Sequence, residues 1–286
     1  MSHHLLLHAL DAPWACLPEH HAMVCDLVEA WVRGERVDSG ELEARRGNSL
    51  PGPVQGYEVR DGVAIIPVMG TMSPRINLMA DVSGGVSAEL LARDVRAAAA
   101  DPKVRALILQ VDSPGGAVAG TPGAASAVMA VRGRKPVAAL VDGTMASAAY
   151  WVGSAAEQVY LSSPVDRAGS IGVIMRHRDT SQAKAAAGVV DTEIVAGRFK
   201  NAASDNGPLS ETGREVLQRQ VDAIYSVFVG DVARQRGKSV DQVVSDMAEG
   251  RVFIGQQAID AGLADGFASL DDLVSEMKSR AKWRRL

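Results

Sequence analysis

The chain has 286 residues, of which 47% are hydrophobic, so it is long enough to bury one sizeable core with attachments. Its 30 Lys and Arg against 34 Asp and Glu leave a formal charge of −4, without basic runs interleaved with aromatic residues, so no nucleic-acid partner is expected. The basic end "KSRAKWRRL" is interpreted as a solvated helix end. Two cysteines, Cys16 and Cys25, are too few for a disulfide scaffold, which indicates a reducing compartment.

Residues 1–56 are expected to form an N-terminal extension and linker, with a helix in "EHHAMVCDLVEAWVRG" and a linker in "GNSLPGPVQG". The opening "MSHHLLLHALDAPW" lacks a cationic start and is too short for an export signal or a membrane span, so we expect no membrane anchor and a cytoplasmic protein. No HExxH or paired CxxC spacing organises the local histidines, so neither a metal nor a cofactor is expected. These histidines are His3, His4, His8, His20 and His21.

Residues 57–207 are expected to form an α/β catalytic core, because strand and helix patterns alternate along them. Such alternation favours parallel β-α-β units with right-handed crossovers. The predicted strands are "GVAIIPVMGTM", "VRALILQVD", "KPVAALVDG", "QVYLSS" and "SIGVIM", and the predicted helices are "VSAELLARDVRAAAADP", "AGTPGAASAVMAVRG" and "MASAAYWVGSAA".

Residues 208–286 are expected to be a helical region that completes the fold. A capping-box pattern at Thr212 and Glu215 precedes an apolar stripe, which predicts a long amphipathic helix from Glu211 to Arg236. Shorter helical segments follow around "VDQVVSDMAEG", "GQQAIDAGLAD" and "LDDLVSEMKSRA".

The stretch "LQVDSPGGAVAG" ends a buried strand with a glycine pair before a helix. Paired glycines let backbone N–H groups approach a ligand closely, and the helix start favours anions or oxyanions. Neither GxGxxG nor GxxxxGK[ST] is present, so a phosphate site is weakly indicated. A tight strand-to-helix turn without function would explain the same pair.

Ser147 lies at the next strand-to-helix junction, in "LVDGTMASAAYWVGSAA". Adjacent parallel strands end at the same edge of a sheet, so the two junctions are expected to face each other. Ser147 could act only as a helix N-cap. Alternatively it is a nucleophile, with the N–H of Ala148 and that of Gly115 or Gly116 forming an oxyanion hole.

A nucleophilic serine needs a base. His177 lies among arginines in a polar stretch, which is more typical of a surface residue. A lysine can serve if its amine is neutral, which requires its surroundings to favour that form. Lys200, in "VAGRFKNAASDNGPLS", is the favoured candidate and is expected at a strand end near the site; Lys135 and Lys184 are weaker candidates.

The motifs "DSPGG", "MASAAYW", "AGSIGV" and "GRFK", in this order, resemble the signal peptide peptidase A family of serine proteases, from about Tyr57 to Phe267. The resemblance implies a crotonase/Clp-peptidase-like fold of repeated β-β-α units and a Ser/Lys dyad. It implies that Ser147 is the nucleophile and Lys200 the general base. It assigns Ser170 to orienting the lysine amine, and Gly115 and Gly116 to lining the oxyanion hole.

Within that family the sequence looks most similar to the head maturation proteases of tailed phages. The phage resemblance implies action on scaffold, capsid or portal-proximal chains inside a procapsid in the host cytoplasm. The resemblance to the signal peptide peptidase A family implies a homo-oligomer with the active site at a subunit interface. Some phage members continue into a scaffolding region, whereas this sequence stops at Leu286, so a separate scaffold product or an isolated protease part is expected.

Other interpretations stay open. One is a general signal-peptide-peptidase-like peptidase of bacterial origin. A crotonase-fold acyl-CoA enzyme would use the same oxyanion geometry but needs acid/base carboxylates and a CoA channel. A catalytically silent assembly protein would not need Ser147, Ser170 and Lys200 together. A histidine triad would require a histidine where the chain has "LSSPVDRAGS".

Overall fold

The structure, a computed structural model, describes residues 12–32, 56–74 and 85–283. The predicted linker "GNSLPGPVQG" and His3, His4 and His8 lie largely or wholly outside these residues. In chain order, the elements are β1 (Trp14–Cys16), α2 (Pro18–Val32), β2 (Glu58–Arg60), β3 (Val63–Met69), β4 (Thr71–Ser73), β5 (Gly85–Ser87), α5 (Ala88–Ala100), β6 (Ala106–Ser113), β7 (Gly115–Ala117), α6 (Thr121–Met129), β8 (Val137–Ala146), α7 (Ala148–Gly153), β9 (Gln158–Leu161), β10 (Arg167–Gly169), α8 (Ser181–Ala186), α9 (Glu211–Arg236), α10 (Val240–Gln242), a π-helical turn (Val243–Met247), β11 (Val252–Ile254), α11 (Gln256–Asp260), β12 (Gly266–Phe267) and α12 (Leu270–Trp283).

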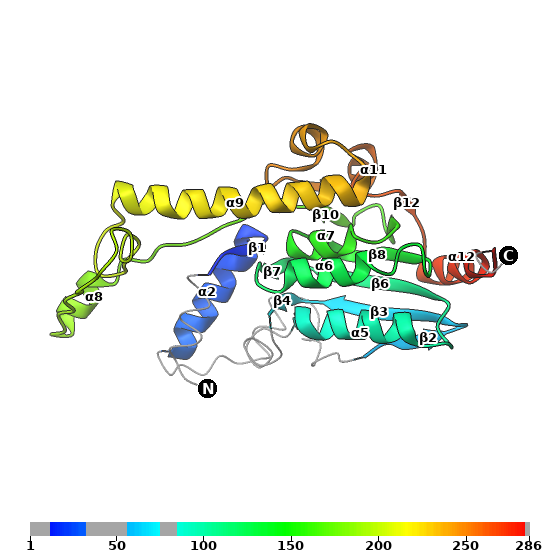
Figure 1. Cartoon of the computed structure of the whole chain (residues 1–286), viewed down its shortest axis with the longest axis horizontal. Coiled ribbons are helices and arrows are strands. Elements are labelled where there is room, and N and C mark those ends of the chain that lie inside the picture. Colours follow the sequence, from blue (N-terminus) through cyan, green and yellow to red (C-terminus); the bar gives the residue numbers. More distant parts are fainter. Residues whose placement is uncertain (1–11, 33–55, 75–84, 284–286) are drawn as a thin grey trace.

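The larger sheet has the strand order β11-β10-β8-β6-β3-β2, with β9 paired to β8 and β12 to β9 (Figure 1). Strands β3, β6, β8, β9 and β10 pair in parallel. A strand of this sheet followed by one or two short strands and a helix recurs as β3-β4-β5-α5 and β6-β7-α6. The structure therefore confirms an α/β class with parallel strands, β-β-α units and C-terminal helices.

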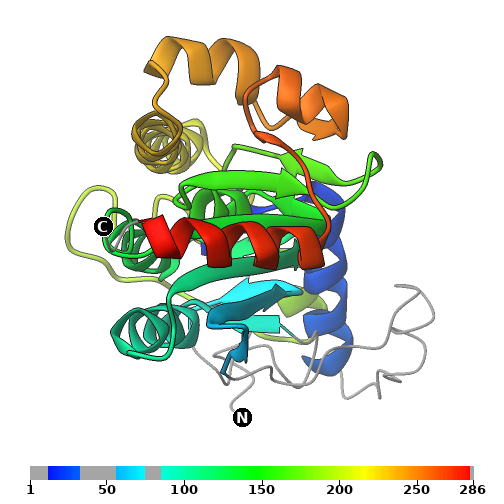
Figure 2. The ribbon, with the colours of Figure 1, turned by 90° about the vertical axis from the view of Figure 1, so that its right-hand side faces the viewer.

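Both faces of the larger sheet are buried, which explains why its central strands are almost continuously apolar. On β6, Leu107 and Leu109 point to the core under α5, α6 and α7, whereas Ala106 and Ile108 point to the opposite face. Helix α12 lies across that opposite face, as Figure 2 shows, and buries an apolar stripe there. The stripe consists of Leu273, Val274, Met277 and Ala281.

A second, smaller sheet has the order β1-β7-β4-β5. Its strand β7 continues directly from the carboxyl end of β6 and carries the glycine pair. Strand β1, from the predicted N-terminal extension, pairs antiparallel with β7. The N-terminal segment therefore packs against the core rather than lying apart from it.

Helix α9 has the predicted bounds, Glu211–Arg236, but it begins with a different cap. The side chain of Ser210, rather than Thr212, accepts the Gly213 N–H at 3.0 Å. The C-terminal half of α9 is docked on the core, where the Phe228 ring stacks on Trp151 with a centroid distance of 4.3 Å. The N-terminal half of α9, helix α8 and the segment that joins them project from the body (Figure 1). We call this part of the chain the arm.

Two strand predictions for the part of the chain between α7 and α9 are wrong. "SIGVIM" is not a regular strand: β10 ends at Gly169, and only Ile174 forms a bridge, to Trp14. The apolar run before Lys200 forms no strand either, and residues 189–210 carry neither helix nor strand. Helices of the described chain include none whose length and apolarity would allow it to cross a membrane.

The stack of Phe228 on Trp151 predicts where α9 is anchored. We expect Phe228→Ala to lower the free energy of unfolding by about 3–5 kcal/mol, because it empties a fully buried ring site. The neighbouring Val227→Ala, at a side chain 54% exposed, should change it by less than about 0.5 kcal/mol. Urea unfolding followed by tryptophan fluorescence measures both, and equal effects would contradict this anchoring.

Candidate active site

Ser147 lies between β8 and α7 with φ 54° and ψ −115°, a backbone region that costs an L-residue about 1–3 kcal/mol. Its N–H donates to the Gly169 carbonyl at 2.7 Å, which holds it in this conformation. Its side chain caps no helix N–H; the Oγ instead donates to the Gly172 carbonyl at 3.3 Å. This geometry argues against a simple N-cap. Ser147 is fully buried.

A bulge in β8 precedes Ser147, where the pairing with β6 shifts register between Val111 and Ser113. Two carboxylates that the sequence analysis did not single out hold this bulge. Asp112 accepts the Thr144 N–H at 3.1 Å, and Asp166 accepts the Gly143 N–H at 3.1 Å. An aspartate at a strand end before "SPGG" was the available signal for the first of them.

Ser170 follows Gly169, the residue whose carbonyl accepts the Ser147 N–H, so the two serines are neighbours in space. Ser170 also has a positive φ, 52°, and its N–H donates to the Arg251 carbonyl at 2.6 Å. Among the described non-glycine residues, four have positive φ; the other two, Asp61 and Glu249, lie in surface turns. The strain is therefore concentrated at the predicted site.

Gly115 and Gly116 lie in β7 where there is no room for a side chain. A Cβ on Gly115 would lie 2.9 Å from the carbonyl oxygen of Ala146, the residue before Ser147. A Cβ on Gly116 would lie 1.9 Å from the Met72 carbonyl oxygen. The Gly115 N–H donates to Ser113 Oγ at 3.2 Å. Ala148 opens α7, so its N–H has no acceptor within that helix.

Lys200 is not brought to Ser147 within the chain. It is exposed, and the segment that carries it, between α8 and α9, lies on the arm at the opposite end of α9 from α7 (Figure 1). The structure thus assembles Ser147, Ser170, Ala148 and the glycine pair, and places Lys200 elsewhere.

The alternative bases have other partners. His177 Nε2 is 2.9 Å from the Ser204 carbonyl oxygen, on the arm. Burial lowers the pKa of Lys135, but its amine donates to the Ala98 and Asp101 carbonyls at the end of α5. The hydrogen bond to Asp191 raises the pKa of Lys184, so that amine stays charged.

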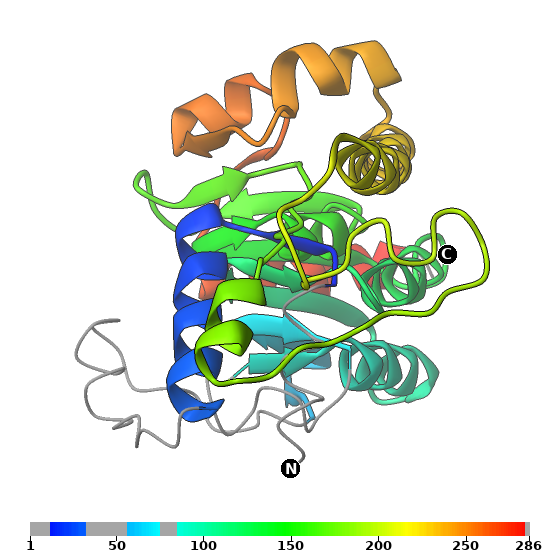
Figure 3. The same ribbon diagram turned by 90° about the vertical axis from the view of Figure 1, so that its left-hand side faces the viewer.

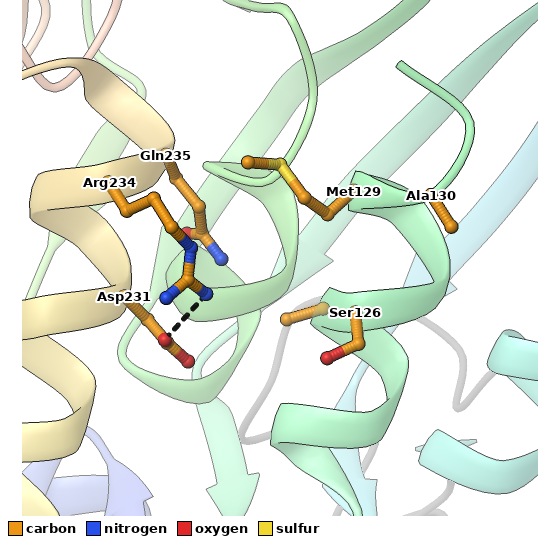
Figure 4. Close-up of a pocket in the computed structure, with 7 residues that line it drawn as sticks. Ser126, Met129, Ala130, Asp231, Arg234 and Gln235 are labelled. Carbon is orange, nitrogen blue, oxygen red and sulfur yellow. Dashed lines mark hydrogen bonds and ion pairs between the residues drawn. The ribbon is translucent and has the colours of Figure 1, made fainter. Parts of the chain in front are cut away.

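Two pockets of the described chain lie away from Ser147, Ser170 and the glycine pair. The first, between α6 and α9, is lined by Met129, Asp231, Arg234 and Gln235 among others; Arg234 pairs with Asp231 at 2.8 Å, so its charges are neutralised (Figure 4). The second lies at the end of α5, around Asp101 and Lys135. In the parts of the chain that the structure describes, no group of three or more His, Cys, Asp or Glu residues could hold a metal ion.

Residues 130–284, more than half of the chain, match the sequence profile of peptidase family S49. The chain belongs to peptidase family S49. This S49 chain is 36% identical over 235 residues to "Capsid assembly protease C" of Escherichia phage lambda, covering 82% of this chain and 53% of that protein. It is 37% identical over 225 residues to "Head-tail preconnector protein GP5" of Enterobacteria phage P21, covering 79% and 44%. The resemblance expected from the motifs is confirmed.

"Protease 4" of Salmonella typhi is 28% identical over 206 residues, covering 72% of this chain and 33% of that protein. The S49 chain therefore spans about half the length, or less, of these curated relatives. Among solved structures, it is similar to a ClpP1 mutant of Listeria monocytogenes, with a TM-score of 0.46 and 13% identity over 73% of this chain and 94% of that one.

The conformation of Ser147 predicts an unusual order of stabilities. Glycine tolerates φ 54° whereas alanine does not, so Ser147→Gly should be more stable than Ser147→Ala by about 1 kcal/mol, even after glycine's entropic cost. Ser154, at φ −64°, is the matched control, and there Ser154→Gly should be less stable than Ser154→Ala by about 0.5–1 kcal/mol. Chemical unfolding measures all four, and the same order at both positions would contradict strain at Ser147.

Proposed function

We propose that this chain is a serine endopeptidase with a Ser147/Lys200 dyad. The observation that carries the proposal is the strained, buried Ser147 beside the glycine-bearing strand β7, in a chain of family S49. A serine held in a sparsely populated conformation at a strand end is typical of an activated nucleophile.

In the proposed reaction, Ser147 Oγ attacks the peptide carbonyl carbon while its proton passes to the neutral Lys200 amine. The N–H groups of Ala148 and of Gly115 or Gly116 stabilise the oxyanion that forms. The carbon–nitrogen bond then breaks, and the leaving amine takes the proton from Lys200. Water then attacks the acyl-serine carbonyl carbon while Lys200 takes its proton, and the ester C–O bond breaks as Lys200 returns that proton to Ser147 Oγ. Ser170 orients the lysine amine.

We place the Lys200 that serves each Ser147 on a neighbouring copy of the chain. Within one chain the two lie apart, and the arm that carries Lys200 exposes a row of apolar side chains. These include Val190 at 87% and Ile194 at 96% exposed, with Val189, Val195 and Phe199 close to half exposed. An exposed apolar patch of this kind favours a protein interface. A homo-oligomer with its active site at the subunit interface follows.

The names of two relatives support a phage role, since one is a capsid assembly protease and the other a head-tail preconnector protein. We therefore propose scaffold, capsid or portal-proximal chains as substrates, cut inside a procapsid in the bacterial cytoplasm. "Protease 4" of Salmonella typhi, at 28% identity, represents the alternative of a general peptidase. Mass spectrometry of the protein mixed with the products of neighbouring genes separates the two: cleavage of scaffold or capsid chains supports the phage role.

The dyad predicts that Ser147→Ala and Lys200→Ala each lower turnover by at least about 10³-fold, because nucleophile and base act as a unit. Circular dichroism should show an intact fold in both variants. His177→Ala and Lys238→Ala, an exposed lysine after α9, are the controls and should retain turnover. A Lys200→Ala variant that keeps its turnover, or a His177→Ala variant that loses it while folded, contradicts the dyad.

A site shared between chains predicts complementation. Mixing Ser147→Ala protein with Lys200→Ala protein should recover part of the turnover, because some interfaces pair an intact Ser147 with an intact Lys200. The measurement is peptide hydrolysis as a function of mixing ratio, with native mass spectrometry to count mixed oligomers. Mixed oligomers without any recovery would place both residues in one chain.

A further inference from the structure

Strand β1 of the N-terminal segment pairs with the strand that carries the predicted oxyanion glycines. Its register on β7 sets Trp14 opposite Ala117, Ala15 opposite Gly116 and Cys16 opposite Gly115, with the two strands antiparallel. The three β1 residues and Leu17 are at most 5% exposed. This short segment is therefore fully inserted into the body of the protein.

The hydrogen bonds of β1 use both of its edges. On one edge the Val118 N–H donates to the Pro13 carbonyl at 3.2 Å, and the Leu17 N–H donates to the Pro114 carbonyl at 3.0 Å. Hydrogen-bonded pairs alternate along an antiparallel ladder, so the intervening pair of Ala15 and Gly116 is also of the hydrogen-bonded kind.

On the other edge, Trp14 and Ile174 exchange two backbone bonds, of 2.9 Å and 2.8 Å. Ile174 belongs to the segment "SIGVIM", which the sequence predicts as a strand and which forms only this bridge. Strand β1 thus lies between Ile174 of this segment and β7, and it forms backbone hydrogen bonds with both.

Strand β1 also passes close to Ser147, the proposed nucleophile. The Cβ position of Gly115 that lies 2.9 Å from the Ala146 carbonyl oxygen is also 2.3 Å from the Ala15 carbonyl oxygen and 3.0 Å from the Cys16 Cα. Chain atoms of β1 and the residue before Ser147 therefore meet at one point on β7. An extended peptide whose carbonyl carbon was to reach Ser147 would need this space.

The backbone contacts that hold β1 do not depend on its sequence, whereas the buried Trp14 side chain, which is 2% exposed and contacts the His21 ring, adds packing that does. The backbone contacts are main-chain hydrogen bonds to two open strand edges, which is how proteins add an extended peptide as an extra strand. The side chains nearest the glycines are small, those of Ala15 and Cys16, as the crowding there requires. Burial raises the pKa of the Cys16 thiol to about 12, so it stays neutral in this place.

Helix α2 fastens β1 in position, because it follows directly and runs along the side of the body (Figure 3). His20 Nε2 is 2.6 Å from Thr71 Oγ1, and Glu29 pairs with Arg178. A strand tethered this closely has an effective concentration of about millimolar or more at its place between β7 and Ile174.

We propose that β1 occupies the groove in which a substrate peptide binds, so that each chain is closed by its own N-terminal strand until that strand is displaced. The inference rests on the proposed function for what the groove does. It adds that the occupant in the resting chain is residues 13–17, and that substrate must compete with them.

The test measures peptide binding without turnover, in full-length Ser147→Ala protein. The probe is a fluorescent peptide of the sequence of residues 12–18, followed by anisotropy. Ala15→Asp is added to release β1, because a carboxylate at this fully buried position must return to water. The matched control is Ala22→Asp, the same change at a half-buried position of α2. We expect Ala15→Asp to bind the probe at least about tenfold more tightly than Ser147→Ala alone, and Ala22→Asp to leave binding unchanged.

Hydrogen exchange of the unsubstituted protein provides a second measurement that needs no variant. The Val118 amide, which is bonded to Pro13, should exchange at least about tenfold faster than the amides of Leu107 and Leu109 in β6, because only the former is freed when β1 leaves. Equal exchange would make β1 a permanent part of the fold and overturn the proposal.

Unchanged probe affinity in a folded Ala15→Asp variant would also overturn it. Failure of the proposed function has a different signature. If the chain were no peptidase, no variant would hydrolyse peptides, yet the binding and exchange results would still report whether β1 blocks the groove. If both hold, Ala15→Asp with Ser147 intact hydrolyses added peptide faster than the unsubstituted chain, and the unlabelled probe slows it again.

Discussion

Burial of both faces of the central strands is the constraint on which the rest of the structure depends. Helices α5, α6 and α7 cover one face of β6 and β8, and α12 covers the other. Polar chemistry is therefore excluded from the strand interiors and gathers where the strands end. The carboxyl end of β6 leads into the glycine strand β7, and that of β8 leads into Ser147. The two ends meet because β6 and β8 are parallel neighbours.

The strained conformations of Ser147 and Ser170 persist because the surrounding ladder leaves the backbone no alternative. The pairing of β8 with β10 places Gly169 opposite Ala146, and the Ser147 N–H donates to the Gly169 carbonyl. The pairing of β10 with β11 places Gly169 opposite Val252, and the Ser170 N–H donates to the Arg251 carbonyl. The carboxylates of Asp112 and Asp166 satisfy the N–H groups freed by the bulge. The geometry of the candidate site therefore follows from the strand register of the sheet.

Two segments outside the larger sheet connect this site to its surroundings, with opposite proposed effects. The arm carries Lys200 outward with exposed apolar side chains, and in our proposal it completes the site of a neighbouring copy. In our proposal, the N-terminal strand β1 lies in the substrate-binding groove and closes the site of its own chain. Assembly and displacement of β1 would then both be required before cleavage, which suits a protease that must wait for its substrate to gather.

The elements with a long, local residue pattern could be predicted from the sequence alone. The 3.6-residue period and its flanking residues predicted α9 at Glu211–Arg236, and continuous apolar runs predicted β6 and β8, with Ser147 at the junction that follows. The four short motifs around the glycine pair, Ser147, Ser170 and Lys200 indicated the protein family. Three features became visible only in the folded chain: Ser210 caps α9, "SIGVIM" forms a single bridge at Ile174 rather than a strand of the sheet, and Lys200 lies apart from Ser147. The tertiary structure alone placed β1, three residues long, against β7 about a hundred residues later. A local pattern of apolar residues predicts the secondary structure of a segment. The backbone hydrogen bonds that pair a short strand can be made by almost any sequence. The partner of such a strand therefore depends on which strand edge is unpaired in the folded chain.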